Sequence, residues 1–235
     1  GKGLTFDTGG VSLKPGLNMD QMKFDMCGSA VVFGVMNAIA ELQPDMNVVA
    51  IVPSTHNMLG GSAYKPGDIL TAYNGKTIEV LNTDAEGRLI LADALAYASK
   101  QYDPEYMLDF ATLTGAVVVT LGHIATGLMS NNDTLVENIK VSSDNTGEHV
   151  WQLPLWEEYC DQVKSDVADV KNLGSPGQAG TIAGAAFLKA FVGKDIPWAH
   201  FDVAGTSYHV ENRSYIQKNS ASGQVIRLVL DLLGA

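Results

Sequence analysis

Short apolar runs alternate with longer helix-like segments along most of this chain. A continuous apolar run bounded by turn residues is typical of a buried strand. The runs expected to form strands are Asn47–Val52, Thr77–Leu81, Tyr106–Thr112 and Trp198–Val203. The segments expected to form helices are Met26–Leu42, Gly87–Lys100, Thr134–Gly147, Ala179–Val192 and Ser222–Leu233. This alternation predicts an α/β fold in three layers, with a mixed, largely parallel central sheet and helices on both faces.

The length of 235 residues fits one domain, which we expect to span residues 1–235. A hydrophobic fraction of 46% and a charged fraction of 17% exclude a disordered chain. We find no stretch of about 18 uncharged apolar residues, so we expect no membrane span. The chain opens on Gly1-Lys2-Gly3 and runs directly into a strand-like Leu4–Phe6. We therefore expect a fragment or a processed chain.

The charge balance and the cysteines indicate the compartment and the partners. Acidic residues outnumber basic ones by 26 to 15, which gives a net charge of −11. This excess argues against a broad phosphate-binding surface and against nucleic acid as the main partner. Cys27 and Cys160 lie far apart in a chain too large to need a disulfide. We expect free thiols in a reducing compartment, the cytoplasm.

The segment Asn82–Leu89 carries two acids and a basic residue between a predicted strand and a predicted helix. Asp84 and Glu86 are two residues apart, so in an extended segment both side chains point to one side and repel unless a cation lies between them. The alternative is a helix start with an acidic cap and a first-turn glutamate. Spacing alone leaves both interpretations open. Arg88 favours a site, because a cation at a helix N-terminus opposes the helix dipole.

Two further acids stand at the ends of predicted elements. Asp7 ends the first strand ahead of Gly9-Gly10, where the backbone must bend or approach a partner closely. Asp25 precedes the helix at Met26 and is equally compatible with a helix cap. Lys14, taken alone, would be an exposed loop lysine. Four carboxylates in a chain of low charge are nevertheless the ligand set of hard or borderline dications, and two such ions would balance them.

The remaining polar and aromatic residues form no competing site in the sequence. The five histidines fall in no metal-binding pattern, and we expect His200 to be a hydrogen-bonded core residue. A nucleophilic-serine elbow and a phosphate-binding loop are both absent from the sequence. We expect Trp151, Trp156 and Trp198 to be core or interface anchors.

Several blocks resemble the cytosolic leucine aminopeptidases, a family of dinuclear metallopeptidases. Asn82–Leu89 (NTDAEGRL) is similar to the family signature, and the resemblance extends from residue 1 to about residue 230. The other blocks are Gly1–Gly10 with Lys14-Pro15, Met22–Gly28, Ala111–Ala116 and Trp198–Thr206. The chain departs from the family at Cys27, where glycine is common, and at Ser29, where alanine is common. The resemblance implies an N-terminal domain ahead of the matching blocks, and we expect this chain to lack it.

The resemblance implies a role for each matching residue. The residues that match the family's metal ligands are Lys2, Asp7, Asp25, Asp84 and Glu86. The residues that match its other catalytic groups are Lys14, which stabilises the oxyanion, and Arg88, which holds a bicarbonate ion. The residues implied for the side-chain pocket are Met22, Thr112 and Gly115. Two divalent ions (Zn²⁺ or Mn²⁺, with Mg²⁺ or Co²⁺ as alternatives) would then neutralise four carboxylates, with Lys2 deprotonated to coordinate.

The resemblance also implies an activity. The family removes N-terminal residues, with Leu, Met and other apolar residues preferred, by attack of hydroxide held between two metal ions. Substrates would be peptides with a free N-terminus, and the protein would be a homo-oligomer, a hexamer in the family. Two alternatives stay open: a two-metal phosphoesterase, and a non-catalytic DNA-binding or architectural member of the same family.

Overall fold

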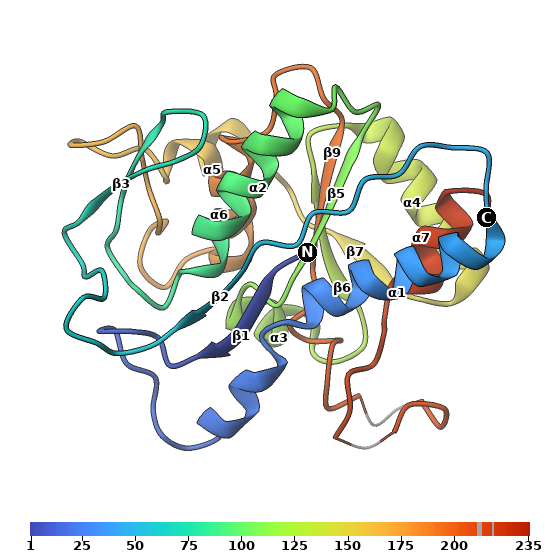
Figure 1. Cartoon of the computed structure of the whole chain (residues 1–235), viewed down its shortest axis with the longest axis horizontal. Helices are drawn as coiled ribbons and strands as arrows, with labels where there is room; N and C mark the ends of the chain where they lie inside the picture. The colour runs from blue at the N-terminus through green and yellow to red at the C-terminus, as the bar shows by residue number, and fades with distance from the viewer. Residues whose placement is uncertain (211–212, 218) are drawn as a thin grey trace.

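The computed structural model describes residues 1–210, 213–217 and 219–235, and its strands form three hydrogen-bonded sheets (Figure 1). The largest has the order β5-β9-β6-β7, formed by Met107–Ala111, Trp198–Asp202, Thr126–Ser130 and Val150–Gln152. The second has the order β3-β4-β8, formed by Ile69–Thr71, Thr77–Glu79 and Val170–Lys171. The third pairs β1 (Gly3–Asp7) with β2 (Ser54–Asn57).

The strand pairing confirms a mixed, largely parallel arrangement. Among the described residues, the parallel pairs are β1–β2, β4–β8, β5–β9 and β6–β7, and the antiparallel pairs are β3–β4 and β6–β9. The two-stranded sheet adjoins the largest one, because the Lys2 amide donates to the Phe110 carbonyl at 2.9 Å. This contact places the start of β1 beside the carboxyl end of β5. Ligand sites in open α/β sheets form at the carboxyl ends of strands.

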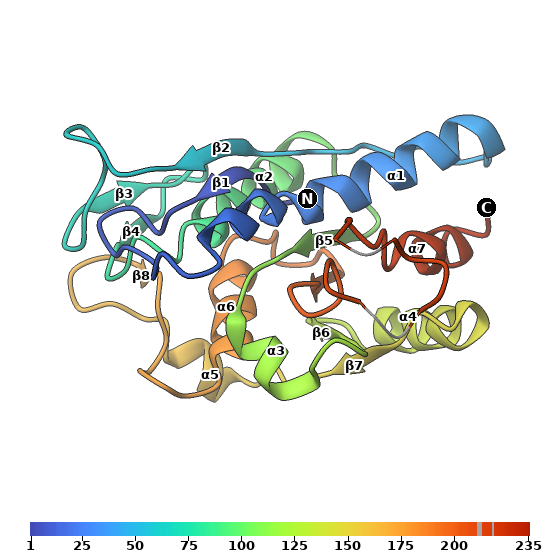
Figure 2. The ribbon, with the colours of Figure 1, turned by 90° about the horizontal axis from the view of Figure 1, so that it is seen from below.

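Helices cover both faces of the largest sheet (Figures 1 and 2). One face carries α1 (Cys27–Leu42), α4 (Asp133–Thr146) and α7 (Ile226–Leu232). The other carries α2 (Gly87–Gln101) and α6 (Gly180–Lys189), and α5 (Glu157–Asp161) packs on α6. Two short helices, η1 (Met19–Phe24) and α3 (Gly115–Leu121), lie near the strand ends. The fold class predicted from the sequence is therefore confirmed.

Alternation along β5 and β9 divides the core into two clusters. Phe110 and Phe201 point to the α1 side, where their ring centroids lie 5.0 Å apart. Trp198 points to the α2 and α6 side and packs with Leu91 and Phe187. Its full burial confirms the prediction of a core residue for this tryptophan. The other two tryptophans, Trp151 and Trp156, are 65% exposed and do not belong to the core.

One predicted strand is wrong. Residues 47–52 form no strand, and β2 begins only at Ser54. The run is extended and lies beside the first residues of the chain: the Gly1 amine donates to the Ile51 carbonyl at 2.9 Å, and the Gly3 amide to the Pro53 carbonyl at 3.1 Å. Val49 is 54% exposed, so the apolar run lies on the surface instead of in the sheet interior.

The helical stretch Met19–Leu42, which joins η1 to α1, has the length and hydropathy of a membrane span, with a mean hydropathy of 1.3. The stretch contains four charged residues, Asp20, Lys23, Asp25 and Glu41, so it does not contradict the expectation that no run of about 18 residues is both uncharged and apolar. The core helix of a soluble domain meets the same criterion, and Val31 and Val35 of this stretch are buried in the core.

Cys27 and Cys160 are both free, as predicted.

Candidate metal centre

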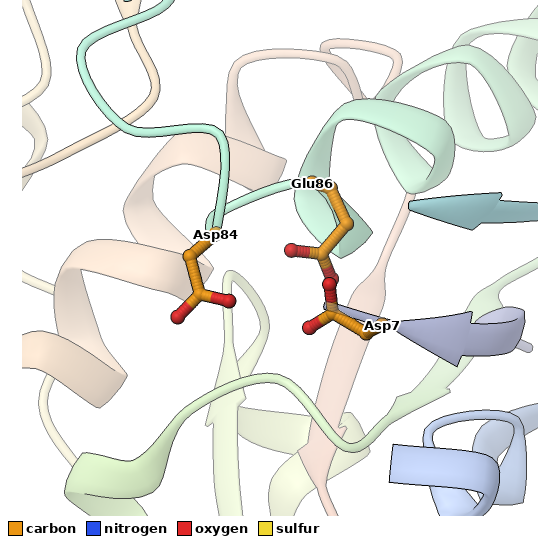
Figure 3. A group of neighbouring side chains, drawn as sticks. All are labelled: Asp7, Asp84 and Glu86. Carbon is orange, nitrogen blue, oxygen red and sulfur yellow. The ribbon is translucent and has the colours of Figure 1, made fainter. Parts of the chain in front are cut away.

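Three carboxylates meet where β1 ends and α2 begins (Figure 3). Asp7 is the last residue of β1, and Glu86 immediately precedes α2. Asp84 lies in the turn between β4 and α2. One carboxylate oxygen from each residue lies within 4.8 Å of the other two. Asp7 and Glu86 are buried, so their charges require a cationic partner.

Lys2 connects this group to the fourth predicted acid. The Lys2 ammonium lies 2.7 Å from Asp25 Oδ1 and 3.0 Å from Glu86 Oε1, and it donates to the Thr112 carbonyl at 2.8 Å. Gly87 leaves the space that the lysine side chain fills, because a Cβ at this position would lie 2.3 Å from Lys2 Cε. The start of α2 therefore helps to determine where the amine stands.

Lys14 lies on the other side of the carboxylate group. Its Nζ is 2.9 Å from Asp7 Oδ2 and 2.5 Å from Asp84 Oδ1. The Lys14 side chain is 23% exposed, whereas the Lys2 side chain is 3% exposed. Two ammonium groups thus lie among four carboxylates, and each contacts two of them. Positive charge is held at two separate positions of the cluster.

Burial and charge determine the pKa values in the cluster. Burial raises the pKa of Asp25 to about 7, because desolvation of the carboxylate outweighs the attraction of Lys2. Burial also raises the pKa of Asp84. Burial alone would lower the pKa of Lys2, but Asp25 and Glu86 together raise it. The lysines therefore neutralise only part of the negative charge.

The donor set fits a divalent cation. Two buried carboxylate oxygens, Asp25 Oδ2 and Glu86 Oε2, have no hydrogen-bond partner among the described residues. A buried polar atom without a partner is destabilising unless something else satisfies it. Clustered carboxylate oxygens are the ligands of hard and borderline dications, so the residues present suit such an ion.

The cluster lines a cavity of about 210 Å³. Its lining includes all the predicted metal-binding residues, Lys14, and the predicted pocket residues Met22, Thr112 and Gly115. Apolar and aromatic side chains complete the wall: Phe24, Leu113, Val118, Ala204 and Tyr208. The cavity thus has a charged end and an apolar wall, which suits a small ligand with a polar and an apolar part.

Arg88 is the predicted site residue that does not line this cavity. It is buried on α2, where Nη1 donates to the Asn172 carbonyl at 3.0 Å and Nε finds no partner in the part of the chain that the structure describes. Burial lowers the pKa of Arg88, and attraction by Glu86 and Asp202 offsets this only in part. A buried guanidinium with a free N–H is suited to binding an anion.

Two asparagines that the sequence analysis missed hold the acidic segments in place. The Asn57 amide donates to Asp7 Oδ1 at 2.8 Å and to the Thr83 carbonyl at 2.9 Å. Asn172 accepts from the Leu81 amide at 2.8 Å through Oδ1. No signal in the sequence marks either residue, because a single amide in a loop belongs to no periodic pattern.

The sequence matches known proteins over almost its whole length. A family model described as "Cytosol aminopeptidase family, catalytic domain" matches residues 1–230. The chain is 56% identical over 233 residues to the "Probable cytosol aminopeptidase" of Desulfotalea psychrophila. The aligned region covers 99% of this chain and 46% of that protein. Proteins of the same description from Cenarchaeum symbiosum and Roseiflexus castenholzii are 52% and 53% identical, again over 99% of this chain. The chain spans about half the length of these curated relatives.

Proposed function

The chain belongs to the cytosol aminopeptidase family, and we propose that residues 1–235 form the catalytic domain of a metal-dependent exopeptidase. Its substrates in this proposal are peptides with a free N-terminus, from which it removes the first residue. The observation that carries the proposal is the cluster of four carboxylates and two lysines at one end of the cavity.

We assign two divalent metal ions, Zn²⁺ or Mn²⁺ with Mg²⁺ or Co²⁺ as alternatives, to this cluster. The residues that would hold them are Lys2, Asp7, Asp25, Asp84 and Glu86. The unpartnered carboxylate oxygens and the two sites of positive charge support this assignment. Lys2 coordinates only as a neutral amine, so its proton must leave when it becomes a ligand. Bound dications supply Lewis acidity to a substrate carbonyl and lower the pKa of water.

The protein's own residues then bind and orient the substrate. Lys14 reaches the cavity and, in this proposal, donates to the oxygen that becomes negative during peptide cleavage. The buried Arg88 would hold a bicarbonate ion, which would supply a general base when bound. A planar guanidinium binds such an anion through two parallel hydrogen bonds, which lysine does not form. The unpartnered Arg88 Nε supports this role.

We propose that the apolar wall selects the first side chain of the peptide. Met22, Thr112 and Gly115 line the cavity beside the charged end. A flexible methionine and a glycine leave adaptable apolar space, which favours Leu, Met and other apolar residues. The charged end receives the substrate's α-amine. A blocked amine removes this contact, so the assignment predicts strict dependence on a free N-terminus.

We also propose that the protein acts in the cytoplasm as a homo-oligomer, with a hexamer as the expected state. The relatives are named cytosol aminopeptidases, and the chain has two free cysteines, which suits a reducing compartment. Trp151 and Trp156 are each 65% exposed, and large exposed aromatic side chains are typical of interface anchors. Their exposure supports association.

The test compares leucine amide with N-acetyl-leucine amide as substrates of the same preparation, together with metal analysis. We expect release of leucine from the free amide only, in protein that contains divalent metal and loses activity with a chelator. Comparable rates on the free and the acetylated substrate would overturn the assignment. The variant Lys65→Ala, in an exposed ion pair with Asp68, is a control that should retain full activity.

A further inference from the structure

Asp202 ends β9 and is completely buried on the α2 and α6 side of the sheet. Asp202 Oδ1 accepts hydrogen bonds from the amides of Leu113 at 3.1 Å and Ala204 at 3.2 Å. Asp202 Oδ2 accepts from the Thr114 hydroxyl at 2.7 Å. Two of these three donors belong to the segment 112–115 that follows β5. The Asp202 carboxylate therefore fixes the position of this segment.

The segment 112–115 connects Asp202 to the candidate metal centre. At its first residue, the Thr112 carbonyl accepts from Lys2 Nζ at 2.8 Å and the Thr112 hydroxyl donates to Asp25 Oδ1 at 2.7 Å. All four residues of the segment line the cavity. Adjacent residues thus contact Asp202 on one side and the charged cluster on the other. A shift of the segment would move the cavity wall and the partners of Lys2 together.

The segment is also confined from the side of α6, which lies beside α3 (Figure 2). The Thr114 and Thr181 hydroxyl oxygens are 3.0 Å apart. A Cβ on Gly184 would lie 3.0 Å from Leu113 Cδ2 and 3.4 Å from Thr114 Cγ2. Thr114 caps α3 as well, because its hydroxyl accepts from the Val117 amide at 3.2 Å. The segment is therefore held from several sides, and Asp202 accepts two of the hydrogen bonds that hold it.

We propose that Asp202 is a positioning residue for the reaction. Its hydrogen bonds fix the position of segment 112–115 relative to Lys2 and Asp25, and this position determines where the peptide binds. This inference rests on the proposed aminopeptidase function. Small displacements of a substrate-positioning element lower rates strongly, by about 10²-fold for 1 Å. Asp202 itself touches neither substrate nor metal in this proposal. In this proposal its main effect passes through Leu113 and Thr114, which donate hydrogen bonds to its carboxylate.

The experiment compares three variants: Asp202→Ala, Asp202→Asn and Asp109→Asn. Alanine removes all the hydrogen bonds, whereas asparagine keeps an acceptor for the two amides. Asp109 is the matched control, because it is another buried aspartate of the same sheet, and within the described part of the chain its carboxylate forms hydrogen bonds only with Trp198 and His200. The measurements are kcat and KM for leucine amide, metal content, thermal stability, and hydrogen exchange of backbone amides 113–117.

We expect Asp202→Ala to lower kcat/KM about 10²-fold, with the larger part in kcat, at unchanged metal content. Asp202→Asn should lower kcat/KM only about tenfold relative to the wild type. Asp109→Asn should lose thermal stability with kcat and KM unchanged. Wild-type kinetics in Asp202→Ala would overturn the inference. Equal kinetic losses in Asp202→Ala and Asp109→Asn would also overturn it, since a general loss of structure would then explain both.

Hydrogen exchange separates this inference from the proposed function. If the wild-type protein cleaves no peptide, the proposed function fails, and exchange still decides the positioning role. Asp202→Ala should then accelerate exchange of amides 113–117, whereas Asp109→Asn leaves them protected. Unchanged exchange in Asp202→Ala would overturn the positioning role. If Asp202→Ala does not fold, Asp202→Asn and Thr114→Val replace it. Thr114→Val removes the hydroxyl contact to Asp202 together with those to Thr181 and the Val117 amide. Both variants should accelerate exchange of amides 113–117 relative to Asp109→Asn, and unchanged exchange in both would overturn the positioning role.

Discussion

The side-chain amide of Asn57 donates one hydrogen bond to Asp7 Oδ1 and a second to the carbonyl of Thr83, the residue before Asp84. One amide therefore holds the end of β1 against the turn that precedes α2. Because Asn57 occupies one Asp7 oxygen, the second oxygen remains directed at Lys14. This neutral side chain therefore helps to set the angle between two of the proposed ligand segments, together with the Thr83 hydroxyl, which donates to the Gly9 carbonyl at 2.6 Å.

Asn57→Ala should weaken divalent-metal binding, because the hydrogen-bond partners of ligating carboxylates orient them. We expect a loss of about 10–100-fold in affinity for Mn²⁺ or Zn²⁺, measured by calorimetric titration of metal-free protein. The control is Asn145→Ala, since Asn145 is exposed and donates to Asp231 away from the cluster. Equal affinities in Asn57→Ala and wild type would show that Asp7 is oriented without this amide.

Arg88 and Asp84 should differ in what their removal does. Arg88→Ala should lower kcat by about 10²–10⁴-fold with metal content unchanged, because the guanidinium is assigned to an anion and not to a cation. Asp84→Asn should lose both metal and activity, because an amide is a poorer ligand than a carboxylate. Elemental analysis beside steady-state kinetics measures both effects. The roles are wrongly assigned if Arg88→Ala loses its metal or Asp84→Asn keeps two ions.

Divalent metal should stabilise the folded chain. An ion that binds the folded state only raises the free energy of unfolding, by about 2.7 kcal/mol at a hundredfold excess over Kd. We expect thermal unfolding of metal-free protein to shift upward with Mn²⁺ or Zn²⁺, and Glu86→Gln to reduce the shift. An equal shift in Glu86→Gln and wild type would place the stabilising ion elsewhere. Lys65→Ala should respond as wild type does.

Stability should also depend on the buried pair of His200 and Asp109, whose Nδ1 and Oδ1 lie 2.7 Å apart. Burial alone would lower the pKa of His200, but Asp109, with a contribution from Asp202, raises it against the effect of Arg88. The folded state therefore binds this proton more tightly than the unfolded state does. The resulting stabilisation is complete below about pH 6.5 and is lost as the pH rises through the folded-state pKa.

Urea unfolding of metal-free protein at a series of pH values from 6 to 9 measures this contribution. The free energy of unfolding should fall with rising pH more steeply in the wild type than in His200→Gln, which cannot titrate. Parallel pH profiles for the two proteins would contradict a shifted His200. Trp198 donates to the other Asp109 oxygen in both proteins, so that contact does not distinguish them.

Much of the fold could be predicted from apolar patterning, because long segments carry enough residues to show it. Each of the five predicted helices overlaps an observed one, and Tyr106–Thr112 and Trp198–Val203 contain β5 and β9. The predicted strand Thr77–Leu81 contains the three-residue β4, but other short elements were missed. The strand β7 has three residues, and β6 (Thr126–Ser130) lies within an apolar stretch that gives no strand boundary. The strand predicted for residues 47–52 was wrong for another reason. An apolar run shows that a segment is hydrophobic, but it does not show whether the segment pairs with a neighbouring strand.

The candidate site was predicted to the extent that acids mark the ends of elements. Asp7, Asp84 and Glu86 do converge, and Lys2 brings Asp25 to them. Which carboxylate faces which ammonium could not be predicted, because those pairs join residues distant in the sequence. The supporting amides and Asp202 were missed for the same reason. Their roles depend on contacts that only the folded chain creates.

The space at Gly87 has an entropic consequence for Lys2. A lysine side chain gives up about 1.5–2 kcal/mol of rotamer freedom when it is held in one conformation. Here that freedom is lost when α2 packs against the start of β1, because the methylene chain lies directly over the glycine. The amine is therefore ordered during folding, and an arriving cation does not have to restrain it. A side chain at position 87 would displace Lys2 from this conformation. The entropy cost of ordering the lysine would then fall on cation binding.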